Sequence, residues 1–331
     1  MRTKNTVLPF LFLLILSTFS SVILVTAQST TSLTVATNKQ TTYNKYDPIT
    51  ISGTLKSGSL SPSDGLVGIQ IDYPNSEGPM VLRTVQTGST EVINLPEQIT
   101  TAYSSNSGGS PASVAQNGNL GYFTASITDT DDQAHTGLLV ISIYDGNGVP
   151  LGLVYTTMSI GAEATQSPTL SIPVPTTAHS GTAYGYADLY SGFPQNGGIP
   201  LAQEQSFQFT ISGGTSSSGP APTTVSATAG AYSLTFKLPK TCPDGAYTVY
   251  ASASYANQDV TAQTGFNVLL IGDFDFAGVV NGNDLFIFAA AYINYYEGLP
   301  YNSLCDINNQ GKVDATDFFL FVGAYIQYWS P

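Results

Sequence analysis

The stretch DFDFAGVVNGND occupies residues 273–284, and DINNQGKVDATD repeats its pattern 33 residues later at 306–317. Both stretches have aspartate at positions one and twelve and glycine at position six. A run of apolar residues without Lys, Arg or Glu follows each of them. One such match arises often by chance, whereas two copies in register with their following segments indicate a duplicated structural unit.

The spacing of oxygen-bearing residues predicts that each stretch is a calcium-binding loop. Ca²⁺ takes six to eight oxygens at about 2.3 to 2.6 Å, and a twelve-residue loop supplies them from positions 1, 3, 5, 9 and 12 and from the carbonyl of position 7. Gly278 and Gly311 occupy position six, where the chain turns sharply. We expect two calcium ions, with these ligands: Asp273, Asp275, Asn281, Asp284 and the Val279 carbonyl, then Asp306, Asn308, Gln310, Asp314, Asp317 and the Lys312 carbonyl.

Position five distinguishes the two loops. Ala277 supplies no ligand there, whereas Gln310 supplies a neutral one. Water can replace the missing oxygen, so we expect the first loop to bind calcium more weakly but to be occupied. Position twelve is Asp in both loops instead of the Glu of sensor-type loops.

The duplicated loops, each followed by one apolar helix, resemble the repeat of a type I dockerin module. The resemblance covers residues 272–329 and continues beyond the loops, because LFIF at 285–288 matches FFLF at 318–321 and AYINY at 291–295 matches AYIQY at 324–328. It implies EF-hand-like calcium binding, calcium-dependent folding and protein binding to a cohesin-like partner or another β-rich surface protein. Such pairs assemble extracellular complexes for polysaccharide catabolic processes.

The partner-reading positions differ from those of cellulosomal dockerins, which usually carry Ser-Thr inside the loop and Lys-Arg further along. This chain has Gly-Asn at 282–283 and Ala-Thr at 315–316, then Ala-Ala at 289–290 and Val-Gly at 322–323. It resembles more closely the apolar-helix variants found on archaeal and bacterial surface proteins.

Neither predicted helix has a clear solvated face. A module of about 60 residues buries only about 60% of its unfolded surface, so part of this apolar surface should meet something else. In one interpretation this apolar surface contacts a separate protein, and the module mediates attachment or assembly. In the alternative the chain is a structural subunit of a surface layer or filament, and the module packs on its own preceding domain.

The N-terminus has the features of a signal peptide. Arg2 and Lys4 precede an apolar run at 7–25, and VTA at 25–27 fits a small-residue cleavage site. An uncleaved anchor is the competing interpretation because the run approaches the span of a bilayer, but its internal STFSS argues against this. We expect residues 1–27 to be removed, leaving a secreted or cell-surface protein without membrane insertion.

The charge balance excludes an anionic partner. The chain has 9 Lys and Arg against 22 Asp and Glu, a net charge of −13 that becomes −15 when Arg2 and Lys4 leave with the signal peptide. Such a chain repels nucleic acid and anionic lipid. We therefore expect no nucleic-acid partner.

Residues 29–270 are predicted to be rich in β-strands. Short runs alternate apolar and polar residues between clusters of Gly, Pro, Asn and Ser. Regular short strands without helical periodicity predict sandwiches. The clearest runs are LTV at 33–35, ITI at 49–51, IQI at 69–71, LVISI at 139–143, FQF at 207–209 and FNV at 266–268.

A second, weaker duplication lies within this region. LSIPVP at 170–175, followed by GTAYGYA at 181–187, echoes LTFKLP at 234–239, followed by GAYTVYA at 245–251. A strand, a proline-containing corner and a Tyr-rich strand resemble the end of an immunoglobulin-like domain, as in MG2-type and bacterial Ig-like repeats of surface proteins. Residues 32–55 resemble the start of such a domain.

These patterns predict a mainly β protein with a small α C-terminal module. Its fold class is two immunoglobulin-like β-sandwiches followed by a two-helix dockerin-like calcium-binding domain. A first boundary near residue 135 also fits. The predicted divisions are a sandwich at 29–161 with a long loop or insertion at about 88–118, a linker at 162–168, a sandwich at 166–270 and the calcium module at 271–331.

The sequence contains no recognisable catalytic motif. His135 and His179 are the only histidines and lie on different predicted segments, so neither a Ser-His-Asp nor a metallohydrolase arrangement can be recognised. We therefore expect no enzymatic activity. The acids Asp129, Asp131 and Asp132 are interpreted as a solvated turn or as a further calcium site.

Tyr184, Tyr186 and Tyr190 lie on one Tyr-rich segment. They could stack on sugar rings, which would make the chain a carbohydrate-binding or polysaccharide-degradation accessory protein. Tyrosines on one face of a strand are, however, more often core and surface filler.

The two cysteines leave two possibilities open. Cys242 sits in a predicted turn, and Cys305 directly precedes the second loop. An oxidising exterior would permit a bridge between the last β-domain and the calcium module, and two independent thiols fit equally well.

Overall fold

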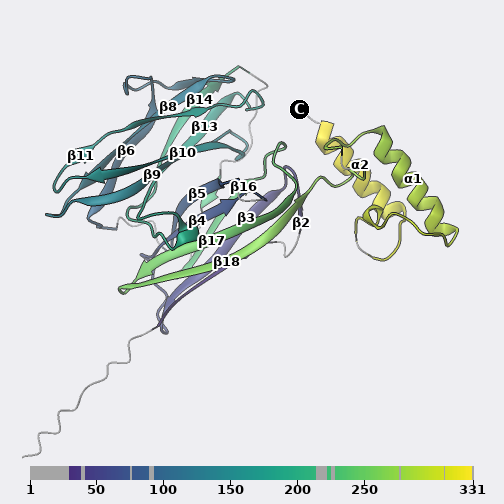
Figure 1. Cartoon of the computed structure of the whole chain (residues 1–331), viewed down its shortest axis with the longest axis horizontal. Helices are drawn as coiled ribbons and strands as arrows, with labels where there is room; N and C mark the ends of the chain where they lie inside the picture. The colour runs from purple at the N-terminus through teal and green to yellow at the C-terminus, as the bar shows by residue number, and fades with distance from the viewer. Residues whose placement is uncertain are drawn as a thin grey trace, which may run out of the picture.

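The structure is a computed structural model with a mainly β architecture and two C-terminal helices (Figure 1). The predicted signal peptide at residues 1–27 lies outside the described residues. Within the part of the chain described, no helix has the length and apolar character needed to span a bilayer. The described residues are 30–38, 42–74, 77–88, 93–213, 222–224, 228–275, 277–308 and 310–329.

Strands from two separated parts of the chain form the first pair of sheets, here called the outer pair. One sheet has the order β1-β3-β16-β15 and the other has the order β2-β18-β17-β4-β5. Alternating apolar side chains, such as Ile49 and Ile51 of β3 and Val249 of β17, meet in a common core between them. The strands are β1 (Thr31–Thr37), β2 (Thr42–Asn44), β3 (Pro48–Ser57), β4 (Leu66–Asp72), β5 (Pro79–Gln86), β15 (Thr223–Thr224), β16 (Ala231–Lys237), β17 (Gly245–Tyr255) and β18 (Gln258–Leu269).

The intervening chain forms a second pair of sheets, here called the inserted pair. One sheet has the order β11-β8-β12 with β6 also on β8, and the other has the order β10-β9-β13-β14-β7. Phe123, Ile141 and Phe209 belong to its separate core. The strands are β6 (Glu97–Ser105), β7 (Val114–Gln116), β8 (Leu120–Asp129), β9 (His135–Tyr144), β10 (Pro150–Ile160), β11 (Thr165–Gln166), β12 (Thr169–Pro173), β13 (Gly181–Tyr190) and β14 (Gln205–Ser212).

The inserted pair interrupts the outer pair between β5 and β15. Ile51 of β3 pairs with Leu234 of β16, so the two ends of the β-region share a sheet. Strand pairing therefore divides these residues differently from the predicted consecutive sandwiches at 29–161 and 166–270. Alternation of apolar and polar residues identifies a strand but not the strand with which it pairs. The insertion of one sheet pair within the other therefore cannot be detected from local sequence.

The segment predicted as a long loop, about 88–118, contains two strands. β6 pairs with β8 from Glu97 to Ser105, and β7 pairs in parallel with β14. The expectation of a long loop was wrong because a Ser- and Thr-rich composition is also compatible with an edge strand, where side chains remain partly exposed. The six clearest predicted strand runs all lie within strands of the structure.

The two pairs repeat one connectivity. In each, the first strand (β1, β6) pairs with the third (β3, β8), and the short second strand (β2, β7) pairs in parallel with the last (β18, β14). In each, the proline-containing corner leads from one sheet to the other, from β16 to β17 and from β12 to β13. The weak duplication in the sequence therefore corresponds to a repeated sheet crossover.

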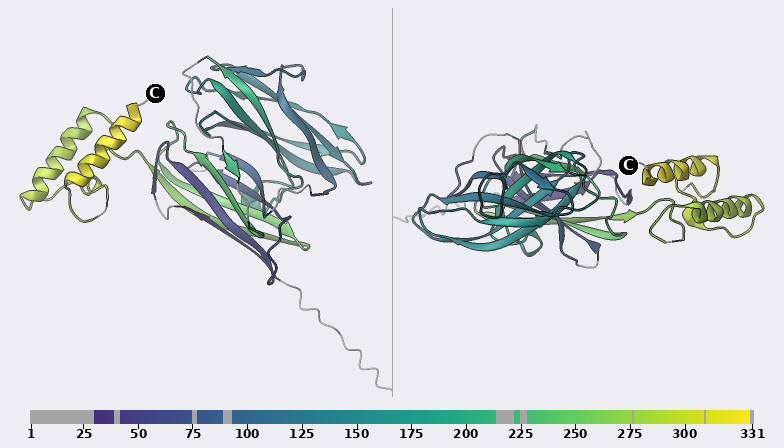
Figure 2. Two further views of the ribbon diagram at one scale, coloured as in Figure 1. Left: turned by 180° about the vertical axis from the view of Figure 1, so that it is seen from behind. Right: turned by 90° about the horizontal axis from the view of Figure 1, so that it is seen from above.

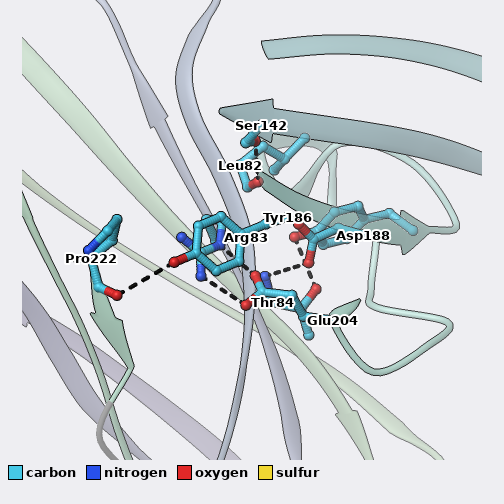
Figure 3. A network of polar contacts seen from close by, with 9 residues as sticks. Leu82, Arg83, Thr84, Ser142, Tyr186, Asp188, Glu204 and Pro222 are labelled. Atoms are coloured by element: carbon cyan, nitrogen blue, oxygen red, sulfur yellow. Dashed lines mark hydrogen bonds and ion pairs between the residues drawn. The ribbon is translucent and has the colours of Figure 1, made fainter. Parts of the chain in front are cut away.

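An ion pair between buried Arg83 and partly buried Glu204 joins the two sheet pairs. Arg83 of β5 donates from Nε to Glu204 Oε2 and from Nη2 to Glu204 Oε1 at 2.7 Å. The guanidinium carbon lies 3.2 Å from the ring centroid of Tyr186, and the neighbouring Thr84 N–H donates to Asp188 Oδ1 at 2.8 Å. Figure 3 shows these groups converging from β5, β13 and the segment before β14. Burial raises the pKa of Asp188 well above its usual range.

The C-terminal residues form two helices, α1 (Gly282–Tyr296) and α2 (Ala315–Trp329), joined through a 3-10 turn, η3 (Ser303–Cys305). Figures 1 and 2 show them side by side beyond the end of β18, to one side of both sheet pairs. Phe274, Phe288 and Phe321 stack in a third core of their own. The Ile271 N–H donates to Asn44 Oδ1 at 3.0 Å, which ties this module to the outer pair.

Both cysteines are free and buried. Cys242 belongs to the core of the outer pair, whereas Cys305 belongs to the core of the helical module. The structure therefore has two separate thiols instead of a bridge.

Candidate metal-binding loops

Each predicted calcium loop turns at its glycine and then starts a helix. Gly278 and Gly311 have φ values of 78° and 77°, a conformation that glycine adopts without steric cost. In the first loop the Asn281 side chain accepts a hydrogen bond from the Asn283 N–H, and Asp284 accepts one from the Asn281 N–H. These two bonds form a capping box that fixes where α1 begins.

Three carboxylates of the first loop converge. Asp273, Asp275 and Asp284 place ligand oxygens within 4.8 Å of one another, a group that could hold a metal ion. Asp273 and Asp284 are buried, whereas Asp275 is exposed. Burial raises the pKa of Asp273, because few water molecules solvate its charge and other carboxylates lie nearby. A cation at their centre would offset this repulsion.

The second loop repeats the hydrogen bonds of the first. In both loops five backbone N–H groups make six hydrogen bonds to side-chain oxygens, at positions 33 residues apart, so the loops have the same local shape. In the first loop the bonds are Asp275 to Asp284, Ala277 to Asp273 and to Asp275, Gly278 to Asp273, Asn281 to Asp284, and Asn283 to Asn281. In the second they are Asn308 to Asp317, Gln310 to Asp306 and to Asn308, Gly311 to Asp306, Asp314 to Asp317, and Thr316 to Asp314.

The second loop differs in the surroundings of Asp314. Its Oδ2 lies 2.7 Å from Nζ of Lys312, and the hydrogen bond from this ammonium group lowers the pKa of Asp314. The Nδ2 atom of Asn308 is buried without a hydrogen-bond partner. Gln310 is exposed and Val279 is half-buried.

The outward surface of the helices is duplicated too. Phe286 of α1 is 75% exposed and Phe319 of α2 is 71% exposed. The two residues are 33 positions apart and therefore equivalent in the duplicated unit. Further exposed apolar residues on the two helices match in the same way. The matching exposed pairs are Leu285 and Phe318, Tyr292 and Tyr325, Ile293 and Ile326, and Tyr296 and Trp329.

The tyrosines considered for sugar stacking do not form a platform. Tyr186 and Tyr190 are buried, Tyr186 beneath the Arg83 guanidinium and Tyr190 against β5. Their ring faces are therefore unavailable to a sugar. Tyr184 is half-buried against the core of the outer pair.

The structure brings His135 to the acids Asp129 and Asp131, a grouping that is not apparent from the sequence. Glu97 also reaches His135 from the start of β6. Asp132, by contrast, is exposed. The strand pairing of β6 with β8 was the missing information, because it places Glu97 opposite Asp129.

Comparisons with known proteins leave the family open. No family model matches the chain, and no curated protein matches it. Among solved structures, a Paenibacillus cycloisomaltooligosaccharide glucanotransferase aligns at 19% identity over 37% of this chain and 14% of its own, with a TM-score of 0.26. The C-terminal domain of wzt aligns at 14% identity over 39% and 83%, with a TM-score of 0.31. A Bacteroides uniformis beta-glucuronidase aligns at 8% identity over 49% and 26%, with a TM-score of 0.28. These scores carry no argument about function.

Proposed function

We propose that this chain is a non-enzymatic, secreted or cell-surface modular protein whose residues 271–331 form a dockerin-like calcium module for attachment or assembly. Two immunoglobulin-like sheet pairs carry the module. The observation that carries the proposal is the repeated set of loop hydrogen bonds. It gives both loops the same shape, and in the first loop three carboxylates meet where a hard cation with oxygen ligands would sit.

Strand order supports the immunoglobulin-like assignment. Immunoglobulin sandwiches hold strands A, B, E and D in one sheet and C, F and G in the other. The outer pair follows this order, since β1-β3-β16-β15 corresponds to A-B-E-D and β4, β17 and β18 to C, F and G. Tyr247, near the start of β17, donates from its hydroxyl to the Pro243 carbonyl at 2.8 Å, a contact typical of the tyrosine corner in these folds.

The exposed apolar residues support an intermolecular role for the helices. Each helix exposes large apolar side chains, among them Phe286 and Phe319, and exposed apolar groups of this kind mark protein-binding sites. A β-rich surface protein, cohesin-like or otherwise, is the proposed partner. The competing role, a surface-layer subunit with an intramolecularly packed module, is supported by a smaller contact, where Tyr328 lines a cavity with Lys45 and Lys240.

A calcium-dependent binding assay distinguishes these roles. The immobilised chain should retain a purified β-rich envelope protein from its own source in calcium but not in EDTA, and Phe286→Ser with Phe319→Ser should abolish retention. Leu120→Ser removes an exposed apolar residue from β8 and serves as the matched control. Calcium-dependent self-association through the same residues would favour the surface-layer role. Retention that is indifferent to both calcium and the two substitutions would refute attachment through this module.

A further inference from the structure

A cluster of four ionisable side chains lies at one end of the inserted pair, far in sequence from the C-terminal loops. Glu97 begins β6, Asp129 ends β8 and His135 begins β9, with Asp131 in the turn between the last two. Asp129, Asp131 and His135 place ligand atoms within 4.8 Å of one another. The cluster therefore links three strands drawn from both sheets of the pair.

The distances within the cluster fit ligands around a small metal ion. His135 Nδ1 lies 2.9 Å from Glu97 Oε1 and 3.2 Å from Asp129 Oδ2. Zinc binds imidazole nitrogen and carboxylate oxygen at about 2.0 to 2.2 Å, so adjacent ligand atoms around it lie roughly 3 to 3.5 Å apart. Asp131 Oδ2 lies 3.7 Å from the other ring nitrogen.

Hydrogen bonding does not account for this arrangement. Asp129 is 1% exposed, yet its Oδ2 has no hydrogen-bond partner, and neither has the buried Nδ1 of His135. The two carboxylate oxygens therefore lie close to the nitrogen without forming a hydrogen bond to it. A buried carboxylate oxygen without a partner is costly, and buried polar atoms of this kind are normally satisfied.

The second histidine provides an internal comparison. His179 Nδ1 and Asp145 Oδ2 form a 2.8 Å hydrogen bond. The other oxygen of Asp145 accepts from the Asn147 and Val149 N–H groups. Asp145 is therefore fully satisfied as a hydrogen-bonded structural partner, whereas the equivalent pair at His135 is left incomplete.

We propose that Glu97, Asp129, Asp131 and His135 bind one divalent transition-metal ion of the zinc type. The imidazole nitrogen selects such an ion over calcium, which prefers oxygen ligands alone. His135 Nδ1, Asp129 Oδ2 and Glu97 Oε1 lie nearest one another and would be the inner ligands, and Asp131 would supply a further oxygen. The ion would fasten the turn between β8 and β9 to the start of β6.

The test uses the untagged full chain and Zn²⁺ as the probe, in excess calcium so that the all-oxygen loops do not compete. Calorimetry should show one zinc bound per chain. His135→Asn and Asp129→Asn should each weaken binding by at least about tenfold, and His179→Asn, the matched control, should leave it unchanged. The chain has two histidines, so imidazole NMR of the unaltered protein gives an independent readout in which zinc shifts the His135 signals alone.

Absence of zinc binding in excess calcium would overturn the proposal. So would zinc that shifts the His179 signals while leaving those of His135 in place, or an affinity that His135→Asn does not change. Because the NMR readout needs no substitution, a variant that fails to fold does not leave the question open.

Discussion

The backbone N–H of Phe274 donates a 2.7 Å hydrogen bond to Oδ1 of Asp284. This bond closes the first loop, because it joins the residue after position one to the side chain at position twelve. Asp284 is fully buried, and its other oxygen accepts from the Asn281 N–H. One carboxylate therefore holds the loop entrance, caps α1 and faces Asp273 and Asp275.

Asp284→Asn should lower calcium affinity at the first loop and destabilise α1. An amide keeps the size of the side chain but removes one of three converging charges, and its NH₂ group cannot accept the hydrogen bond that one carboxylate oxygen now accepts. We expect the calorimetric stoichiometry to fall from two calcium ions to one. Asp132→Asn removes an equal charge from an exposed position outside the loops and should leave both ions bound.

Phe288→Ala should destabilise the helical module by about 3 to 5 kcal/mol, because it opens a cavity among stacked aromatic rings. Phe286→Ala, two residues earlier, should cost less than about 0.5 kcal/mol, since that ring is mostly exposed. Thermal melts of the helical circular dichroism signal in saturating calcium compare the two. An equal loss of stability in the two variants would show that the Phe286 ring is packed in solution.

Arg83→Met should destabilise the junction of the two sheet pairs by about 3 to 5 kcal/mol, because it leaves Glu204 charged and without its partner. Adding Glu204→Leu should recover much of this loss. Lys45→Met breaks a more exposed pair with Asp244 and should cost no more than about 1 kcal/mol. Denaturant unfolding, followed by the circular dichroism signal of the β-strands, measures the stability of all three variants. A double variant as unstable as the sum of the single variants would contradict a coupled pair.

Alkylation of the two cysteines should distinguish unfolding of the helical module from unfolding of the sheet pairs. Burial raises the pKa of the Cys305 thiol to about 12 and that of the Cys242 thiol to about 11, so both should resist alkylation in calcium. In EDTA we expect Cys305 alone to react, since its core depends on the loops. An unfolded thiol ionises near pH 9 while the folded thiol stays protonated. The free energy of unfolding of each part should therefore fall as pH rises above 9. Simultaneous labelling of both thiols in EDTA would argue against separate unfolding.

The sequence predicted local features well and long-range pairing poorly. Gly278 and Gly311 could be assigned to sharp turns because the loop spacing requires them, and both helices follow as predicted. The strands at 49–51 and 207–209 were identifiable from alternation alone. Which strands pair depends on contacts across more than 180 residues, as for Thr50 and Thr235, and no local pattern records those.

The candidate sites show the same limit. The loop carboxylates converge because all three lie within one twelve-residue stretch. Glu97 and His135 meet only because β6 and β8 pair and β9 follows, so sequence spacing could not connect them. Lys312 was expected to contribute its carbonyl, but its side chain also neutralises Asp314.

The most direct test of the calcium module is circular dichroism of the full chain across a calcium titration, followed by EDTA. If free calcium is about a hundredfold above the dissociation constant, each ion adds about 2.7 kcal/mol, which is large for a module of this size. We predict that EDTA removes the helical signal of α1 and α2 while the β signal persists, and that calcium restores it. A helical signal that is identical with and without EDTA would contradict the account.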